Sequence, residues 1–120
     1  MAKKKILYIE DNKIMRMVLK SILSRDYDVE EASTLQEVTR KVVPHVDIIV
    51  ADLNLPDSEG RETVSRLTEA YFGVPIIVMS ADKGMRKELS REKQVVAFVY
   101  KPDVEPSEFR HMLHRILEET

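Results

Sequence analysis

The sequence predicts an α/β protein in which five helices connect the five strands of a doubly wound parallel sheet. Short apolar runs rich in β-branched residues alternate with longer segments whose apolar residues recur every three or four positions. Strands that alternate with helices in this way pair in parallel and carry helices on both faces. Polar residues also directly follow four of the five predicted strands, which is where such sheets carry their sites.

The composition indicates a single domain over residues 1–120, because the chain can bury a core and shows no repeat or linker. The absence of cysteine excludes disulfides and thiolate metal sites. The net charge of -2 indicates neither nucleic-acid nor membrane binding. The longest apolar run, Val95 to Tyr100, is far too short to cross a membrane. We therefore expect a cytoplasmic protein.

The first strand is expected at 6–9, and Glu10 and Asp11 follow it. A helix comes next, capped by Asp11 or Asn12. Its apolar residues share one face that should lie in the core: Ile14, Met15, Val18, Leu19, Ile22 and Leu23.

The second strand is expected at 27–32, and Ser33 with Gln36 predicts a capping box for the helix that follows. That helix carries Leu35, Val38, Val42 and Val43 and stops at Pro44. The third strand, 48–51, ends at Asp52 and leads into a loop over residues 53–60. Pro56 and Gly60 favour an ordered turn in this loop.

The third helix is expected at 62–71 and is closed by Gly73. The fourth strand, 76–79, ends at Ser80. The next helix, 83–93, should be marginal because Met85 and Leu89 are its only large apolar residues. The fifth strand, 95–100, ends at Lys101-Pro102, and the last helix begins near Pro106.

The strand ends supply the candidate site, since parallel strands bring their carboxyl ends to one edge of the sheet. We expect Glu10, Asp11, Asp52, Ser80 and Lys101 to converge there. Each residue has a simpler interpretation as a helix cap, a turn hydroxyl or a solvated strand end. A common site explains all the strand ends at once, whereas the simpler interpretations require separate coincidences.

The chemistry of this set favours phosphoryl transfer. Three carboxylates repel one another unless a cation lies between them, and Lys101 with hydrated Mg²⁺ would supply that charge. The hydroxyl of Ser80 and the ammonium of Lys101 suit phosphate oxygens. Asp52, in the middle of the set, is the natural nucleophile for an aspartyl-phosphate.

With these residues the sequence resembles, over essentially its whole length, the receiver domain of two-component response regulators (CheY-like). The match comprises the acidic pair Glu10-Asp11, the phosphoacceptor position Asp52, the pair Ser80-Ala81, and Lys101-Pro102. The loop from Asp52 to Gly60 is also similar to the loop of that family. The resemblance implies a flavodoxin-like receiver fold with strand order 2-1-3-4-5.

The resemblance also implies roles for the site residues. A sensor histidine kinase or a histidine phosphotransfer protein would donate a phosphoryl group to Asp52. Mg²⁺ would be bound by Asp11, Asp52 and the backbone carbonyl of Asn54, and Glu10 would help to place the metal. Ser80 and Lys101 would close onto the phosphoryl group. The domain would be a switch that catalyses only its own phosphorylation and dephosphorylation.

Further expectations follow from the same resemblance. Phe98 matches an aromatic switch that turns inward as Ser80 moves, although an ordinary strand residue is the alternative. Asn54 and Asp82 match the positions that tune the phosphoryl lifetime. The Lys101-Pro102 bond is expected to be cis. Ser58-Glu59 and Gln94-Val95 depart from the common pattern of the family.

The weakly packed helix at 83–93 has two interpretations. It carries Lys83, Arg86, Lys87, Arg91 and Lys93, and a solvated helix is the simpler interpretation. The alternative is a bistable element that phosphorylation orders, switching a face formed by the fourth helix, fifth strand and fifth helix toward an output partner or effector domain. A weak homodimer through that face is a further hypothesis. The sequence leaves open whether the domain stands alone.

Two other functions were considered beside the phosphorylated switch. A receiver-like scaffold would bind proteins without phosphorylation, although every chemical position of the site is filled. A hydrolase would use Asp52 on an external phosphate ester, but the chain has no insertion to close over such a substrate.

Overall fold

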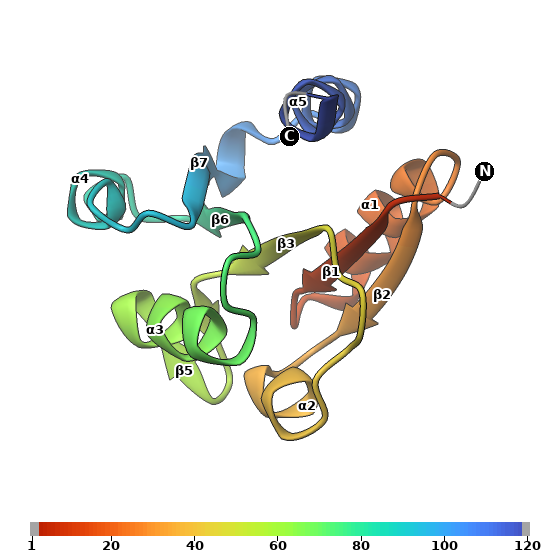
Figure 1. The fold of residues 1–120 in the computed structure, drawn as a ribbon. Coiled ribbons are helices and arrows are strands. Elements are labelled where there is room, and N and C mark those ends of the chain that lie inside the picture. Colours follow the sequence, from red (N-terminus) through yellow and green to blue (C-terminus); the bar gives the residue numbers. More distant parts are fainter. Residues whose placement is uncertain (1–2, 119–120) are drawn as a thin grey trace.

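The computed structural model describes residues 3–118 and contains the expected parallel sheet. The strand order is β2-β1-β3-β6-β7, which corresponds to the predicted order 2-1-3-4-5 (Figure 1). These strands are β1 (Lys5–Ile9), β2 (Asp28–Ala32), β3 (Ile48–Asp52), β6 (Ile76–Ser80) and β7 (Val95–Tyr100). The helices are α1 (Lys13–Leu23), α2 (Leu35–Arg40), α3 (Gly60–Ala70), α4 (Met85–Leu89) and α5 (Pro106–Glu118). The predicted doubly wound architecture is confirmed.

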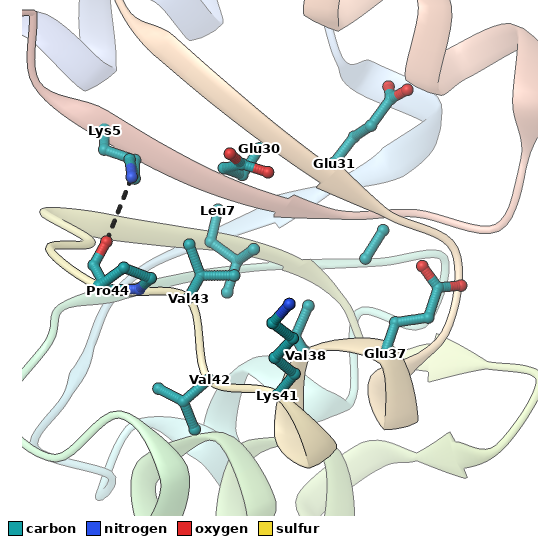
Figure 2. A pocket seen from close by; sticks show the side chains of 11 residues that line it. Lys5, Leu7, Glu30, Glu31, Glu37, Val38, Lys41, Val42, Val43 and Pro44 are labelled. Atoms are coloured by element: carbon teal, nitrogen blue, oxygen red, sulfur yellow. Dashed lines mark hydrogen bonds between the residues drawn. The ribbon is translucent and has the colours of Figure 1, made fainter.

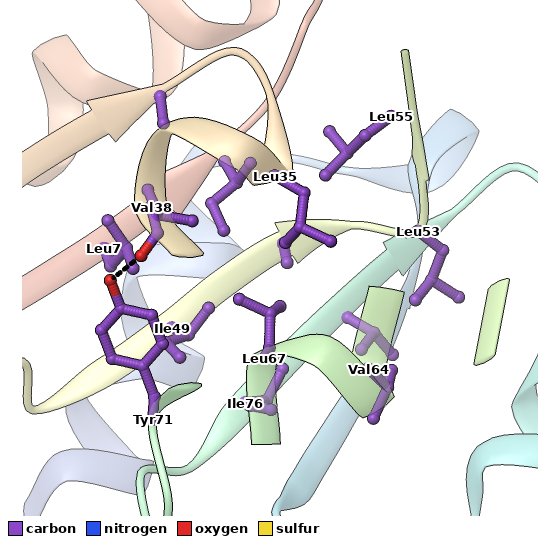
Figure 3. Close-up of a cluster of buried hydrophobic side chains, with 14 of the residues drawn as sticks. Leu7, Leu35, Val38, Ile49, Leu53, Leu55, Val64, Leu67, Tyr71 and Ile76 are labelled. Carbon is purple, nitrogen blue, oxygen red and sulfur yellow. Dashed lines mark hydrogen bonds between the residues drawn. The ribbon is translucent and has the colours of Figure 1, made fainter. Parts of the chain in front are cut away.

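The sheet separates two hydrophobic clusters, one on each face. Leu19 of α1 and Leu113 of α5 pack on one face, while Leu67 of α3 and Leu89 of α4 pack on the other together with α2. Figure 3 shows the second cluster, where the hydroxyl of Tyr71 donates a hydrogen bond of 2.7 Å to the carbonyl of Val38. Within residues 3–118, no helix is both long and apolar enough to span a bilayer.

Helix α1 begins as expected but buries fewer residues than its apolar stripe predicts. The side chain of Asn12 accepts a hydrogen bond of 3.0 Å from the amide of Met15, which makes Asn12 the cap. Ile14 and Val18 are 76% and 46% exposed, so the prediction that they lie in the core is wrong. Ile14 and Val18 each precede a buried or half-buried residue by one position. One position along a helix is a rotation of 100°, which turns these two side chains away from the sheet.

The start of α2 also differs from the prediction. Thr34 is the cap, because its hydroxyl accepts a hydrogen bond of 3.3 Å from the amide of Glu37, and the predicted pair Ser33 and Gln36 is one position too early. Asp57 from the loop after β3 accepts hydrogen bonds from the amides of Leu35 at 2.9 Å and Gln36 at 2.8 Å. The first amides of a helix have no partner within the helix, so Asp57 satisfies two of them.

Because α2 ends at Arg40, the chain reaches β3 without a further helical turn. This leaves a hollow of about 430 Å³ beside β2, with Leu7 and Val38 among the residues that line it and with Glu30 and Lys41 from opposite walls (Figure 2). The hollow contains none of the polar residues that follow the strands. The presence of a hollow therefore does not by itself identify the functional site.

The connection after β7 forms a short 3₁₀ turn, η1 (Lys101–Asp103). The amide of Val104 donates a hydrogen bond of 3.1 Å to the carbonyl of Lys101. The expected cis bond at Lys101-Pro102 is wrong, since residues 3–118 contain no cis peptide bond. The fixed φ of Pro102 suits the first turn of a helix.

The contact between Asp57 and α2 makes a prediction for stability. Burial raises the pKa of Asp57, but the amides of Leu35 and Gln36 outweigh it and hold this pKa below its usual value. The carboxylate should therefore stabilise the fold at neutral pH, and this stabilisation should be lost as the pH falls through the lowered pKa. We expect Asp57→Ala to lower the free energy of unfolding in urea by about 1–2 kcal/mol at pH 7.

Asp57→Asn is the matched control, because its single carbonyl oxygen keeps one of the two hydrogen bonds. The free energy of unfolding of Asp57→Asn should fall between those of the wild type and Asp57→Ala. Equal stability of all three proteins would show that the two hydrogen bonds do not hold α2.

Candidate functional site at the carboxyl ends of the strands

Three carboxylates meet at the carboxyl edge of the sheet. Asp52 is the last residue of β3, and Glu10 and Asp11 directly follow β1, its neighbour in the sheet. One oxygen of each carboxylate lies within 4.8 Å of the others. Glu10 and Asp52 are buried and Asp11 is exposed, so the cluster opens to solvent on one side. The structure therefore brings the predicted acidic residues together.

Lys101 neutralises part of this negative charge. Its Nζ lies 2.7 Å from Oδ2 of Asp52 and 3.0 Å from Oε1 of Glu10. Oδ1 of Asp52 accepts the amide of Asn54 at 3.0 Å, and Oε2 of Glu10 accepts both the amide of Asn12 at 3.1 Å and Nζ of Lys101 at 3.2 Å. These bonds fix the orientation of both buried carboxylates.

The pKa values show how strongly these groups interact. Burial is the main cause that raises the pKa of Glu10 to about 7; Lys101 and the Asn12 amide oppose it, and the charge of Asp52 adds to it. Burial lowers the pKa of Lys101, but the hydrogen bonds that Lys101 donates to Asp52 and Glu10 outweigh burial and raise this pKa. Lys101 therefore stays cationic while Glu10 titrates near neutral pH.

Arg16 of α1 supports the same edge and was not anticipated from the sequence. Its Nη1 donates a hydrogen bond of 2.6 Å to the carbonyl of Glu10, which fixes the turn between β1 and α1. Its Nε lies 3.8 Å from Oε2 of Glu31 on β2. The only sequence signal was a cation one helical turn beyond the acidic pair, and this is too common on helices to identify a role.

Ser80 lies at the end of β6, as predicted, but its hydroxyl is engaged within its own loop. The hydroxyl accepts a hydrogen bond of 2.9 Å from the amide of Asp82 and donates one of 3.3 Å to the carbonyl of Asp82. Oδ1 of Asp82 accepts the amide of Gly84 at 2.8 Å. Phe98 is half-buried and packs against the hydrophobic cluster on the α2 and α3 face.

The loop after Asp52 is held by a buried polar network. It contains the two-residue strands β4 (Asn54–Leu55) and β5 (Ser58–Glu59), which the sequence did not predict. The hydroxyls of Ser58 and Thr63 lie 2.7 Å apart, and Thr63 donates to the carbonyl of Leu53 at 2.9 Å. Ser58, a departure from the usual family pattern, is therefore the buried partner of Thr63. Gly60 has a φ of 54°, in agreement with the predicted permissive position.

The donor set fits a hard divalent cation. Mg²⁺ takes oxygen ligands, keeps several waters and is commonly held by one or two carboxylates. Asp11 and Asp52 offer such oxygens at the ends of adjacent strands, with Glu10 close by. The amide of Asn54 lies against Asp52, and the role of its carbonyl as a ligand remains a prediction.

The fold and the strand-end residues define a receiver domain. The family model of the response regulator receiver domain matches residues 6–114, and the chain belongs to this family. The predicted resemblance is confirmed.

Individual relatives are similar to parts or most of the chain. A protein-glutamate methylesterase/protein-glutamine glutaminase of Trichodesmium erythraeum is 31% identical over 85 residues, covering 68% of this chain and 24% of the relative. The virulence transcriptional regulatory protein PhoP of Salmonella typhimurium is 28% identical over 87 residues, covering 71% and 39%. The chain thus spans well under half the length of these relatives.

Solved structures agree over almost the full chain. The non-phosphorylated HemR receiver domain from Leptospira biflexa has a TM-score of 0.83 and 30% identity, covering 96% of this chain and 94% of that one. A CheY-like response regulator receiver domain protein from Methanospirillum hungatei has a TM-score of 0.85 and 26% identity, covering 98% and 96%.

The raised pKa of Glu10 predicts how stability depends on pH without metal. The folded protein holds this proton up to a pH of about 7, whereas the unfolded carboxyl releases it near 4.5. Between these values the folded state binds more protons, so the stability supplied by this group is lost as the pH rises. We expect Glu10→Gln to remove this decline, measured by urea unfolding in chelator across the same range. Identical pH slopes for the two proteins would contradict the assignment.

Proposed function

We propose that this receiver domain is a phosphorylated signalling switch in which Asp52 accepts a phosphoryl group. The observation that carries the proposal is the buried Asp52 carboxylate bonded to Lys101 at 2.7 Å, within 4.8 Å of Glu10 and Asp11. A carboxylate fixed between one cation and two further carboxylates suits metal-assisted phosphoryl transfer. The donor would be a phosphohistidine on a sensor histidine kinase or a histidine phosphotransfer protein, and the domain would act in the cytoplasm.

The transfer is a displacement at phosphorus. A carboxylate oxygen of Asp52 forms the new P–O bond while the P–N bond of the phosphohistidine breaks, and the imidazole leaves with the electron pair. Lys101 pairs with the anionic oxygens of the phosphoryl group. Asp11, Asp52 and the Asn54 carbonyl, with Glu10 beside them, would hold Mg²⁺, and its charge would neutralise the negative charge of the phosphoryl oxygens. The domain would thus act only on its own phosphorylation state.

The switch would operate through the loop after β6. The Ser80 hydroxyl now bonds to Asp82 and would exchange these bonds for the phosphoryl group. Phe98, half-buried on β7, would move further inward as the Ser80 hydroxyl turns toward the phosphoryl group. Asn54 and Asp82 line a common hollow at this edge, which suits the proposed role of both in tuning the phosphoryl lifetime. The face formed by α4, β7 and α5 would then signal to an output partner.

The exposed apolar residues of α1 suit the docking of the phosphodonor protein. Ile14, Met17 and Val18 are 76%, 60% and 46% exposed on a helix that begins beside Asp11. A partner that delivers a phosphohistidine to Asp52 must cover this edge of the sheet, and apolar side chains supply binding energy there. We therefore include this α1 patch (Ile14, Met17 and Val18) in the proposed contact with the donor.

The direct test is the intact mass after incubation with acetyl phosphate and Mg²⁺. We expect a single phosphoryl adduct on the wild type that requires Mg²⁺ and is absent from Asp52→Asn. Asp57→Asn serves as a control, since it alters the same loop without removing the acceptor. An adduct on Asp52→Asn would identify a different acceptor. If neither an adduct nor a beryllofluoride-induced shift forms on folded protein, the result would favour a scaffold that works without phosphorylation.

The α1 patch predicts a difference between protein and small-molecule donors. Ile14→Glu should slow transfer from a phosphorylated histidine protein by about tenfold or more, because it places a charge in an apolar contact. Reaction with acetyl phosphate should stay unchanged, since that donor needs no docking surface. Phe72→Glu is the control, as Phe72 is 92% exposed after α3. Equal loss with both donors would mean that Ile14 affects the site itself.

A further inference from the structure

A second charged feature lies between α3 and α4, outside the carboxylate cluster. It is a cleft of about 470 Å³ lined by Arg61, Gly84, Lys87, Glu88, Ser90 and Arg91. Arg61 is the second residue of α3, and the others lie in or beside α4. Figure 1 shows the two helices adjacent at one side of the sheet. The lining offers three cations and one carboxylate, so the cleft is positive while the chain as a whole is negative.

The cations of this cleft are available to a partner. Nη1 of Arg61 lies 3.8 Å from Oε1 of Glu88, and both side chains are exposed. Such a long, exposed ion pair contributes little and is easily exchanged. The side chains of Lys87 and Arg91 form no ion pair or hydrogen bond with any residue in the described range 3–118. Two free cations and one weakly paired cation therefore face the same space.

The walls of the cleft are held in place although α4 is short. Leu89 is 1% exposed and anchors α4 in the hydrophobic cluster beneath it. At the other end, a Cβ added to Gly60 would lie 3.2 Å from Cε of Met85, so the start of α3 touches the start of α4. The start of α4 is thus in contact with α3, and its last residue is held in the hydrophobic cluster.

The surroundings limit the kind of anion that fits. The adjoining hollow shares Arg61 and Glu88 with the cleft, and its other charged residues are Glu59, Glu62 and Asp82. A long polyanion such as duplex DNA, which crosses the cleft, would meet these carboxylates and be repelled. A short acidic segment can avoid these carboxylates, because its charge ends where the positive lining ends.

We propose that the α3–α4 cleft docks a short acidic segment of a partner protein. Carboxylates of that segment pair with Lys87 and Arg91, and Arg61 turns from Glu88 to the incoming carboxylate. Association through exposed charges is steered by their field and weakens as salt rises. The charge of the cleft does not depend on Asp52, so this docking stands independently of the proposed phosphorylation.

A hexaglutamate peptide is a direct probe, followed by heteronuclear NMR on the unphosphorylated protein in chelator. We expect salt-sensitive shifts of the amides of Arg61 and of residues 84–91. Lys87→Glu and Arg91→Glu should each weaken binding by about tenfold, and Asp52→Asn should bind like the wild type. Lys41→Glu is the matched control, because Lys41 is also exposed and forms no ion pair with any residue in the range 3–118, but it lines the separate hollow beside β2.

Three results would overturn the proposal. The first is peptide binding that Lys41→Glu weakens as much as Lys87→Glu does, which would indicate a response to net charge alone. The second is a set of shifts outside the cleft, or no shifts. The third is a duplex DNA oligonucleotide that shifts these amides when hexaglutamate does not, which would assign the cleft to nucleic acid.

Discussion

The ion pair between Lys101 and the carboxylates of Asp52 and Glu10 is the interaction on which the site depends. A parallel sheet brings the ends of β1 and β3 side by side, which forces two buried carboxylates into proximity. Without Lys101 this charge would be uncompensated, and burying an unpaired charge costs several kcal/mol. Burial is the main cause that raises the pKa of Glu10, and the hydrogen bond from Lys101 does not outweigh it. A divalent cation would add further positive charge, which links the charge of the site to its proposed chemistry.

The loop after Asp52 connects this charged edge to the rest of the fold. Thr63 of α3 fixes the loop through its bonds to Ser58 and to the carbonyl of Leu53, and Asp57 binds the first amides of α2. The segment from Asp52 to Gly60 therefore carries the candidate phosphoacceptor, leads into α3 and supplies Asp57 to the first amides of α2. A change at Asp52 can therefore reach α2 and α3 through direct contacts of this loop.

Helix α4 has the opposite character. It contains five residues, is anchored by Leu89 and presents unpaired cations to solvent. Few buried apolar contacts imply a low free energy of local opening, which is what a movable element requires. Its exposed charges, however, need no movement to attract an anionic partner. The helix is thus suited both to respond to Asp52 and to bind an acidic segment.

The sequence by itself determined the sheet, the strand order through family resemblance, and the residues that follow each strand. It did so because buried parallel strands are apolar without interruption, which makes a charge at the strand end easy to recognise. It also predicted a marginal helix at 83–93 from the lack of apolar residues, and the structure forms only the shorter α4, Met85–Leu89. Apart from the strand order, these features depend on local pattern alone.

Only the tertiary structure decided which polar groups are partners. The capping of α2 by Asp57 joins residues more than twenty positions apart, and no local signal marks that contact. The exposure of Ile14 and Val18 depends on how far the sheet extends beneath α1, so their helical spacing could not determine it. The trans bond at Pro102 and the bonding of Ser80 to Asp82 depend on loop geometry. Helical periodicity fixes the face of a residue, whereas its burial and its hydrogen bonds depend on what the rest of the chain places against that face.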